Sequence, residues 1–283
     1  MRKRKKKKLL VALLIVGGFS VFYSTHGEAR QTTEEKWDQY NSVQINPIFS
    51  TTNFDSDEGN IEPTEGNNLI LKTDFLKIKH IHGEAETGVA SFQGFSAFKN
   101  LEDVYVEGGG VSDFRPIRNL TNIKRFYMSG TNNNTLIDFE KLNKIEEFSY
   151  EHFSDNGESI ALTDISALSN KNNLKRIKIS VDGNLPKITL SKKNNHYELL
   201  KPIVLSDQFK QDVKYSQVYF EYPENSDDDS VETDDFTSDV SKDGLISWQN
   251  IPTSASHLTF TASADEDLNY YYGSINIPIR WVD

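Results

Sequence analysis

The apolar positions of residues 101–144 repeat with a period of 22 residues. The first line of the repeat is LEDVYVEGGGVSDFRPIRNLTN, and the second is IKRFYMSGTNNNTLIDFEKLNK. Positions 1, 4, 6, 14, 17 and 20 are apolar in both lines: Leu101, Val104, Val106, Phe114, Ile117 and Leu120, then Ile123, Phe126, Met128, Leu136, Phe139 and Leu142. A repeat of this length indicates a solenoid of short coils that stack on one another.

The two halves of each line predict different local structures. Positions 4 and 6 alternate with polar positions 3, 5 and 7, which is the period of a strand with one buried face. Positions 14, 17 and 20 recur every three residues, which favours a 3₁₀ turn that closes the coil. One coil cannot bury its own apolar side, so the pattern requires several coils.

The array extends on both sides of these two lines. Before them, apolar residues at the spacing of positions 11 to 20 indicate an earlier coil: Val89, Phe92, Phe95 and Phe98. We expect the strand of that coil near residues 75–81. After them, the strand pattern recurs twice, the first time in a coil seven residues longer: Ile145, Phe148 and Tyr150, then Leu174, Ile177 and Ile179. The pattern therefore predicts five strands.

The segment GVSDFRPIRNLTNIKRFYM resembles the Ile-x-Asp-Ile-x-Pro-Leu-x-Asn-Leu-Thr-Asn-Leu run in the 22-residue repeat of the internalin family of Gram-positive bacteria. Residues 163–174, TDISALSNKNNL, repeat the match. The resemblance implies a mostly β fold, in which a short leucine-rich-repeat solenoid with parallel strands precedes an immunoglobulin-like domain. We place the leucine-rich-repeat domain at residues 70–182.

After Asp182, short apolar runs alternate with turn residues: PKITL, KPIVL, SQVYFEY, GLISW, HLTFTA and SINIPIRW. Such a series of short strands predicts an antiparallel sandwich. The GLISWQNIP segment and the YGSINIPI ending resemble strands of the immunoglobulin-like domain that adjoins internalin repeats. We therefore expect an immunoglobulin-like β-sandwich at residues 183–283, where it would cover the open end of the repeat core.

The chain begins with a basic run, RKRKKKK at residues 2–8, and a 15-residue apolar run, Leu9–Tyr23. The apolar run is short for a membrane span, which needs about 20 residues. Gly27 and Ala29 are small residues that suit a cleavage site after Ala29. Residues 1–29 are therefore predicted to be a secretory signal peptide, with an uncleaved N-terminal anchor as the alternative. Residues 30–69 are predicted to be a polar, acidic linker that flanks the array.

Composition narrows the classes of function. The chain has no cysteine and a net charge of −11. Cleavage after Ala29 would leave 24 Lys/Arg against 41 Asp/Glu, a net charge of −17. Such a surface repels nucleic acid and anionic lipid, so we expect membrane contact only through an uncleaved N-terminal segment. The C-terminal IRWVD follows no sorting signal, and we expect a secreted protein, released or loosely held at the cell envelope.

Positions 3, 5 and 7 of each strand project away from the core and form the candidate binding surface. In the first coil we expect Lys77 and Lys79 there. In the later coils the partner-binding candidates are Tyr105, Tyr127, Asp103, Glu107, Arg125, Glu147, Arg176 and Lys178. Tyrosine and arginine are enriched among binding anchors. Together with the resemblance to internalins, these candidate residues predict a concave strand face that binds a host or bacterial surface protein. A glycan-binding or structural envelope module is the alternative.

No motif predicts catalysis or a cofactor. His80 and His82 share a strand face, with Glu84 and Glu86 nearby, and such a pair can hold zinc. No further ligand can be named, however, so we expect solvated side chains. The acidic loop at residues 227–235 matches no calcium loop. The sequence has no Gly-x-Ser-x-Gly elbow or P-loop, and we expect no enzyme, no metal and no cofactor.

The signal-peptide prediction can be tested on the exported protein. If residues 1–29 are cleaved, the protein in the medium of producing cells should begin at Arg30 or close to it. Intact mass and N-terminal sequencing measure this directly. A membrane-bound chain that retains Met1 would show that the anchor alternative is correct.

Overall fold

The computed structural model describes residues 42–44, 53–61, 69–85, 92–108, 111–131, 133–152, 159–223 and 237–283. All of them belong to one compact unit, Lys36–Asp283. The predicted signal segment and the acidic loop at residues 227–235 lie outside these ranges. Within them, none of the helices has the length and apolar character needed to cross a bilayer.

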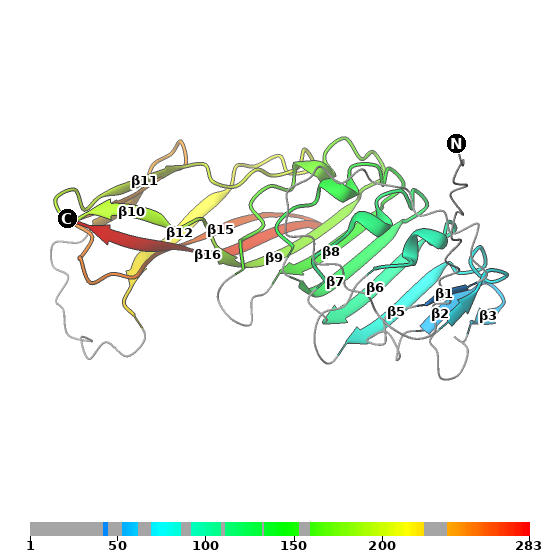
Figure 1. The fold of residues 1–283 in the computed structure, drawn as a ribbon. Helices are drawn as coiled ribbons and strands as arrows, with labels where there is room; N and C mark the ends of the chain where they lie inside the picture. Colours follow the sequence, from blue (N-terminus) through cyan, green and yellow to red (C-terminus); the bar gives the residue numbers. More distant parts are fainter. Residues whose placement is uncertain are drawn as a thin grey trace, which may run out of the picture. The chain divides into compact units, whose positions relative to one another are not determined.

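Five parallel strands form the repeat part of the molecule, as the sequence predicts (Figure 1). They are β5 (His80–Ala85), β6 (Asp103–Gly108), β7 (Arg125–Thr131), β8 (Glu147–His152) and β9 (Arg176–Asn184). Residues at the same repeat position pair directly, so that Val104, Phe126 and Phe148 lie side by side. Short 3₁₀ helices close the coils: η3 (Phe95–Ala97), η4 (Arg115–Ile117), η5 (Ile137–Phe139) and η6 (Ser166–Leu168).

The apolar repeat positions form the core. All those of the two matching lines are buried, with none more than 2% exposed. Phe126 and Phe148 stack with ring centroids 5.6 Å apart, and Phe139 meets them edge-on at 4.8 and 5.1 Å. Such ring pairs contribute about 0.5–1.5 kcal/mol each beyond the burial of their area. The 22-residue period of the sequence is therefore also the register of the core.

The sequence places the first strand too early. We expected it near residues 75–81, but β5 is His80–Ala85, with buried Ile81 at its inward position beside Val104 and buried Ile78 in the segment just before it. Phe75 is buried as well, in the turn before the strand, where its ring lies 6.1 Å from that of Phe98. This additional buried ring imitates the first position of a strand, so the apolar pattern alone cannot separate the two starting points.

The shift changes which side chains of the first coil face solvent beside β6. Lys77 lies in the turn before β5, and Lys79 forms an ion pair with Asp57. The positions that we assigned to these lysines are taken by His80 and His82, which pair with β6. The prediction for Lys77 and Lys79 is therefore wrong.

An antiparallel hairpin covers the N-terminal end of the repeat sheet. β2 (Asn53–Ser56) pairs with β5, and β3 (Gly59–Asn60) pairs with β2. Phe54 of β2 is fully buried, with its ring 6.0 Å from that of Phe98. Nothing in the polar composition of residues 30–69 predicts this hairpin. A separate pair is formed by β1 (Ser42–Gln44) and β4 (Leu69–Leu71).

The long strand β16 (Asn269–Val282) covers the other end. Its first half pairs in parallel with β9, and its last residues pair in parallel with β10 (Ile188–Ser191). Tyr271 of β16 is fully buried and donates a 2.9 Å hydrogen bond to the carbonyl of Leu162. β15 (His257–Glu266) and β12 (Lys214–Glu221) continue the same sheet in antiparallel order. One 11-stranded sheet therefore passes from the hairpin through the repeats into the C-terminal part.

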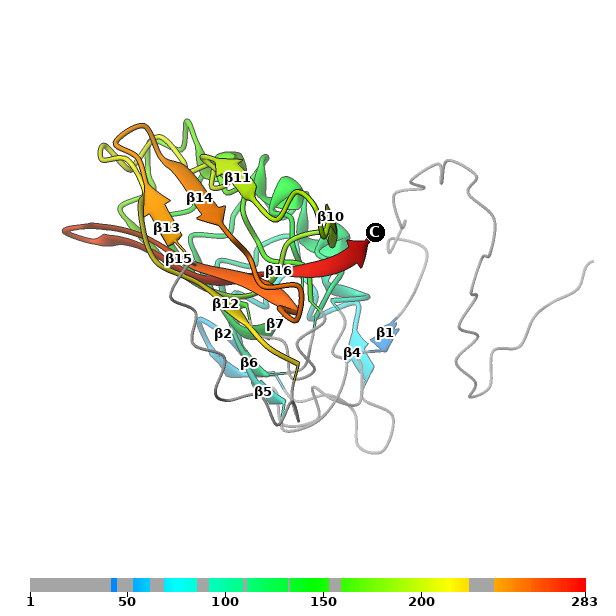
Figure 2. The ribbon, with the colours of Figure 1, turned by 90° about the vertical axis from the view of Figure 1, so that its left-hand side faces the viewer.

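A second sheet packs against the C-terminal end of the first (Figure 2). It consists of β11 (Tyr197–Leu200), β14 (Leu245–Gln249) and β13 (Thr237–Val240). Trp248 of β14 is fully buried; its ring lies 6.2 Å from that of Phe260 of β15, and its indole N–H donates to the carbonyl of Tyr219 at 3.0 Å. The assignment of residues 183–283 to an immunoglobulin-like domain stays a prediction.

The repeat register can be tested at position 20. Leu142 is fully buried, so Leu142→Ala should leave a cavity and lower the free energy of unfolding by about 2–5 kcal/mol. The neighbouring Asn143 is exposed, and Asn143→Ala should change it by less than about 0.5 kcal/mol. Chemical denaturation measures both. Equal stability of Leu142→Ala and the parent would contradict the register.

Candidate interaction face

The side of the sheet that faces away from the repeat core carries every partner-binding candidate from the sequence. Along β8, Phe148 and Tyr150 are buried, whereas Glu147, Ser149 and Glu151 are partly exposed. The same alternation holds for β6, β7 and β9. We call this side the open face. Because the strands are parallel and in register, its residues form rows that run across the strands.

The row at repeat position 3 is a chain of paired charges. The guanidinium of Arg125 donates to the carboxylate of Asp103 through Nε at 2.7 Å and Nη2 at 2.5 Å. His80 Nδ1 lies 2.5 Å from the same carboxylate. On the other side, Arg176 Nη1 lies 3.6 Å from Glu147 Oε2. Asp103, Arg125, Glu147 and Arg176 are therefore already paired within the chain.

Asp103 is the central acid of this row. Its partial burial would raise the pKa of the carboxyl, but the hydrogen bonds from Arg125 and His80 outweigh that cost and lower the pKa below its ordinary value. The same bond to Asp103 raises the pKa of the Arg125 guanidinium. Both groups stay charged across the physiological range, so the pair persists.

The preceding row, at position 2, repeats the alternation of charge. Lys124 binds Glu102 at 2.6 Å, and Lys175 binds Glu146 at 3.1 Å. At positions 2 and 3, acids at the start of β6 and β8 thus alternate with bases at the start of β7 and β9. Exposed pairs of this kind contribute about 0–1 kcal/mol each, so their main effect is to favour one order and register of the strands.

The row at position 5 is aromatic. Tyr105 and Tyr127 stack with ring centroids 4.3 Å apart and planes 10° apart, which confirms that the two rings lie side by side. The ring of His82 extends the stack, 4.5 Å from Tyr105. The Tyr105 hydroxyl donates to the Glu107 carboxylate, and this bond is the main reason that the pKa of Tyr105 is raised. Ser149 and Lys178 follow in the same row.

The open face continues beyond β9, which the sequence did not predict. Tyr270 of β16 pairs with Lys178, and Tyr272 pairs with Ser180. Tyr270 is 38% exposed, and the two tyrosine rings are parallel within 7° at 6.5 Å. The alternation of these two tyrosines around buried Tyr271 is a strand signal, but it does not say which strand lies beside it.

A row of asparagines along the coils was also missed. Each one donates its side-chain amide to a backbone carbonyl of the preceding coil: Asn100 to Leu76 at 2.7 Å, Asn122 to Lys99 at 2.9 Å and Asn173 to Asn143 at 3.1 Å. The signal was present in the sequence, because each asparagine directly precedes the first apolar residue of a strand. These bonds tie neighbouring coils together where no strand pairing does.

The histidines of the first coil have partners other than a metal. His80 and His82 do share the open face, but His80 binds Asp103 and His82 stacks on Tyr105. Glu86 lies outside the described residues. In the part of the chain that the structure describes, no three His, Cys, Asp or Glu side chains gather in a way that could hold a metal ion.

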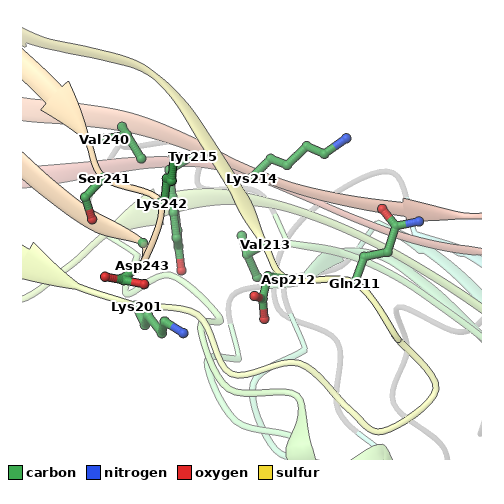
Figure 3. A pocket seen from close by; sticks show the side chains of 11 residues that line it. Lys201, Gln211, Asp212, Val213, Lys214, Tyr215, Val240, Ser241, Lys242 and Asp243 are labelled. Carbon is green, nitrogen blue, oxygen red and sulfur yellow. The ribbon is translucent and has the colours of Figure 1, made fainter.

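A pocket of about 460 Å³ lies between the start of β12 and the turn that joins β13 to β14. Its lining mixes charges: Lys201, Lys214, Lys242, Asp212 and Asp243, with Tyr215 on one wall. In Figure 3 the ammonium of Lys214 points away from Asp212 and Asp243. Lys214 therefore does not share a point of convergence with the two carboxylates.

These features define a protein with a short leucine-rich-repeat array: one parallel strand per coil, an inward apolar face, a 3₁₀ return and an asparagine row. Neither a protein-family model nor a curated protein matches the chain. Solved structures similar to the chain include internalins of Listeria monocytogenes, which are leucine-rich-repeat proteins.

Three of these neighbours differ in how much they share with the chain. The functional domain of InlJ, which includes a cysteine ladder, has a TM-score of 0.44 and 16% identity over 72% of this chain and 44% of its own. InlF has a TM-score of 0.30 and 19% identity over 41% of this chain and 38% of its own. InlC2 has a TM-score of 0.28 and 16% identity over 44% of this chain and 76% of its own. The chain thus spans less than half of InlJ and InlF. At these TM-scores, the assignment of the fold rests on the register and burial described above.

The paired carboxylate predicts a pH-dependent contribution to stability. The pKa of Asp103 is lowered from 3.8 in the folded protein, so its pairing stabilises the fold above that value and is lost as pH falls through the folded pKa. Asp103→Asn should lower the free energy of unfolding by about 1–2 kcal/mol at pH 7. Denaturation at about pH 7 and about pH 2 should show the difference shrinking at the lower pH.

Asp283 provides the control for this experiment. Its side chain is 96% exposed although it pairs with Lys192, and Asp283→Asn should have almost no effect at either pH. A deficit of Asp103→Asn that stays constant across this pH range would contradict the role given to the pair.

Proposed function

We propose that this chain is a secreted, internalin-like, non-enzymatic protein that binds a protein of a host or cell surface through its open face. The observation that supports this most strongly is the row of exposed His82 and partly exposed Tyr105 and Tyr127, held by parallel strands. Aromatic side chains on a rigid support lose little conformational freedom on binding and are frequent binding anchors. Secretion is inferred from the basic and apolar N-terminal segment.

The size of the open face supports a protein partner. Seven strands, β5 to β9 with β16 and β15, span about 29 Å at a spacing of about 4.8 Å. With two or three outward positions on each, they offer at most about 700 Å², close to the roughly 800 Å² per partner of a standard interface. The five repeat strands alone would offer on the order of 500 Å². Strands β16 and β15 therefore belong to the proposed surface.

The candidates divide into two groups by their contacts. Asp103, Arg125, Glu147 and Arg176 pair with one another, so a partner would have to compete for them. We assign them to orientation and register. Tyr105, Tyr127 and Lys178 lie in the row without that pairing, and Glu107 fixes the Tyr105 hydroxyl. We assign direct contact with the partner to these residues.

The stacked arrangement favours protein over glycan as the partner. A sugar ring binds against the flat face of an aromatic ring, but both faces of Tyr105 are covered by His82 and Tyr127. The stack therefore presents ring edges, and one face of Tyr127, to the solvent. Edges with hydroxyl groups suit the mixed apolar and polar contacts of a protein interface.

The proposal predicts losses of affinity at the tyrosines. Tyr105→Ala and Tyr127→Ala should each weaken partner binding by more than about 1 kcal/mol, roughly fivefold. Ile137→Ala is the control, because Ile137 is 57% exposed on η5, at the return turn of its coil. Partners would be captured in parallel from host-cell surface proteins and purified wall glycans, and their affinities measured by titration.

Each alternative has its own result in this experiment. Binding that falls with Ile137→Ala and not with the tyrosine variants would place the site at the turns. Capture from the glycan arm alone would identify a glycan-binding module. Absence of any partner in either arm would favour a structural role in the cell envelope.

A further inference from the structure

We infer that the open face contains a binding position for one aromatic side chain of the partner, above Ser149 and between Tyr127 and Lys178. The inference rests on the proposed function, because it says what the partner inserts there. Three side chains of row position 5 carry it: Tyr127 on β7, Ser149 on β8 and Lys178 on β9, each in register with the next.

Tyr127 supplies an uncovered ring face on one side of this position. Its ring is parallel to that of Tyr105 within 10°, and the centroids are 4.3 Å apart, close to the spacing of the strands. The ring normals therefore point across the strands. One face of Tyr127 lies against Tyr105, and the other is directed toward the row position of Ser149. No aromatic ring within the described ranges stacks on that second face.

Ser149 leaves room for a ring. β7 and β9 lie on either side of β8, so Tyr127 and Lys178 are about 9.6 Å apart across the row, two strand spacings. The short side chain of Ser149 cannot fill that width. A ring placed midway would be about 4.8 Å from the Tyr127 ring, within the range of stacked aromatic pairs.

Lys178 supplies the other side. It is exposed, and its flexible stem lets the ammonium approach the second face of the inserted ring. At about 4.8 Å it lies within the roughly 6 Å reach of a cation–π contact. The inserted ring would continue the existing order of the row: His82, Tyr105, Tyr127, then the partner's ring, then Lys178 and Tyr270.

The same geometry disfavours other occupants. A guanidinium or ammonium would stack on Tyr127, but it would meet the positive charge of Lys178 on its other face. A sugar needs several directed hydrogen bonds; on β8, Glu147 is already paired with Arg176, and Glu151 is the acid that flanks the position on the other side. An aromatic side chain would stack on Tyr127 and contact the ammonium of Lys178, and it would need no hydrogen bond from Ser149 beneath it.

The experiment uses N-acetyl-tryptophanamide as the probe, titrated into the isotope-labelled protein and followed by NMR chemical shifts. We expect saturable shifts centred on the Ser149 amide and the Tyr127 ring. Ser149→Tyr, which fills the position with the chain's own ring, should abolish these shifts. Ser180→Tyr is the matched control, because it adds the same ring to the open face in another row and should leave probe binding unchanged. Lys178→Met should weaken binding about two- to fivefold.

Several results would overturn the inference. These are absence of probe shifts at Ser149, undiminished shifts in a folded Ser149→Tyr protein, or stronger binding of chitotetraose than of the tryptophan probe at the same position. The captured partner separates this inference from the proposed function. Loss of partner affinity with Tyr127→Ala but not with Ser149→Tyr would refute only the binding position. Full affinity in both variants would refute the open face as the binding site.

Discussion

In-register stacking of coils is the constraint on which the rest of this structure depends. A single coil exposes its whole apolar side, and the side is buried only when the same positions of the next coil lie against it. Inside the molecule this suits like residues, because aromatic rings at equal positions can stack, as Phe126 and Phe148 do at 5.6 Å. The repeat in the sequence therefore reflects a core in which residues at one repeat position pack against residues at the same position of the next coil.

On the open face the same constraint acts against like residues. Equal positions lie about 4.8 Å apart, and like charges at such a distance repel one another even in water. The sign of the charge at position 3 alternates from strand to strand, so that Asp103 pairs with Arg125 and Glu147 pairs with Arg176. In the sequence these charged residues look like part of a recognition surface. In the structure they pair with one another and favour one order of the strands. Aromatic residues are free of this restriction, since they can stack in a row.

The sequence predicted the features that depend on local period and failed where distant segments meet. The buried positions, the 3₁₀ returns and the side-by-side placement of Tyr105 and Tyr127 all follow from a 22-residue line. The first strand was misplaced because buried Phe75 imitates a strand position. The β2 hairpin has no periodic signal. The extension of the open face onto β16 joins residues about 90 apart, as the bond from the Ile177 amide to Asn269 Oδ1 illustrates, and no local pattern encodes that pairing.

The end of a stacked core must be covered, and in this molecule the covering strand also enlarges the exposed surface. Because strand side chains alternate, Tyr271 of β16 turns inward to the carbonyl of Leu162, while Tyr270 and Tyr272 turn outward. The inward residue closes the core, and the outward pair adds aromatic surface beside Lys178 and Ser180 of β9. Closure of the core and enlargement of the open face are thus assigned to opposite sides of one strand. A substitution at Tyr270 or Tyr272 therefore changes the open face without removing the inward residue that closes the core.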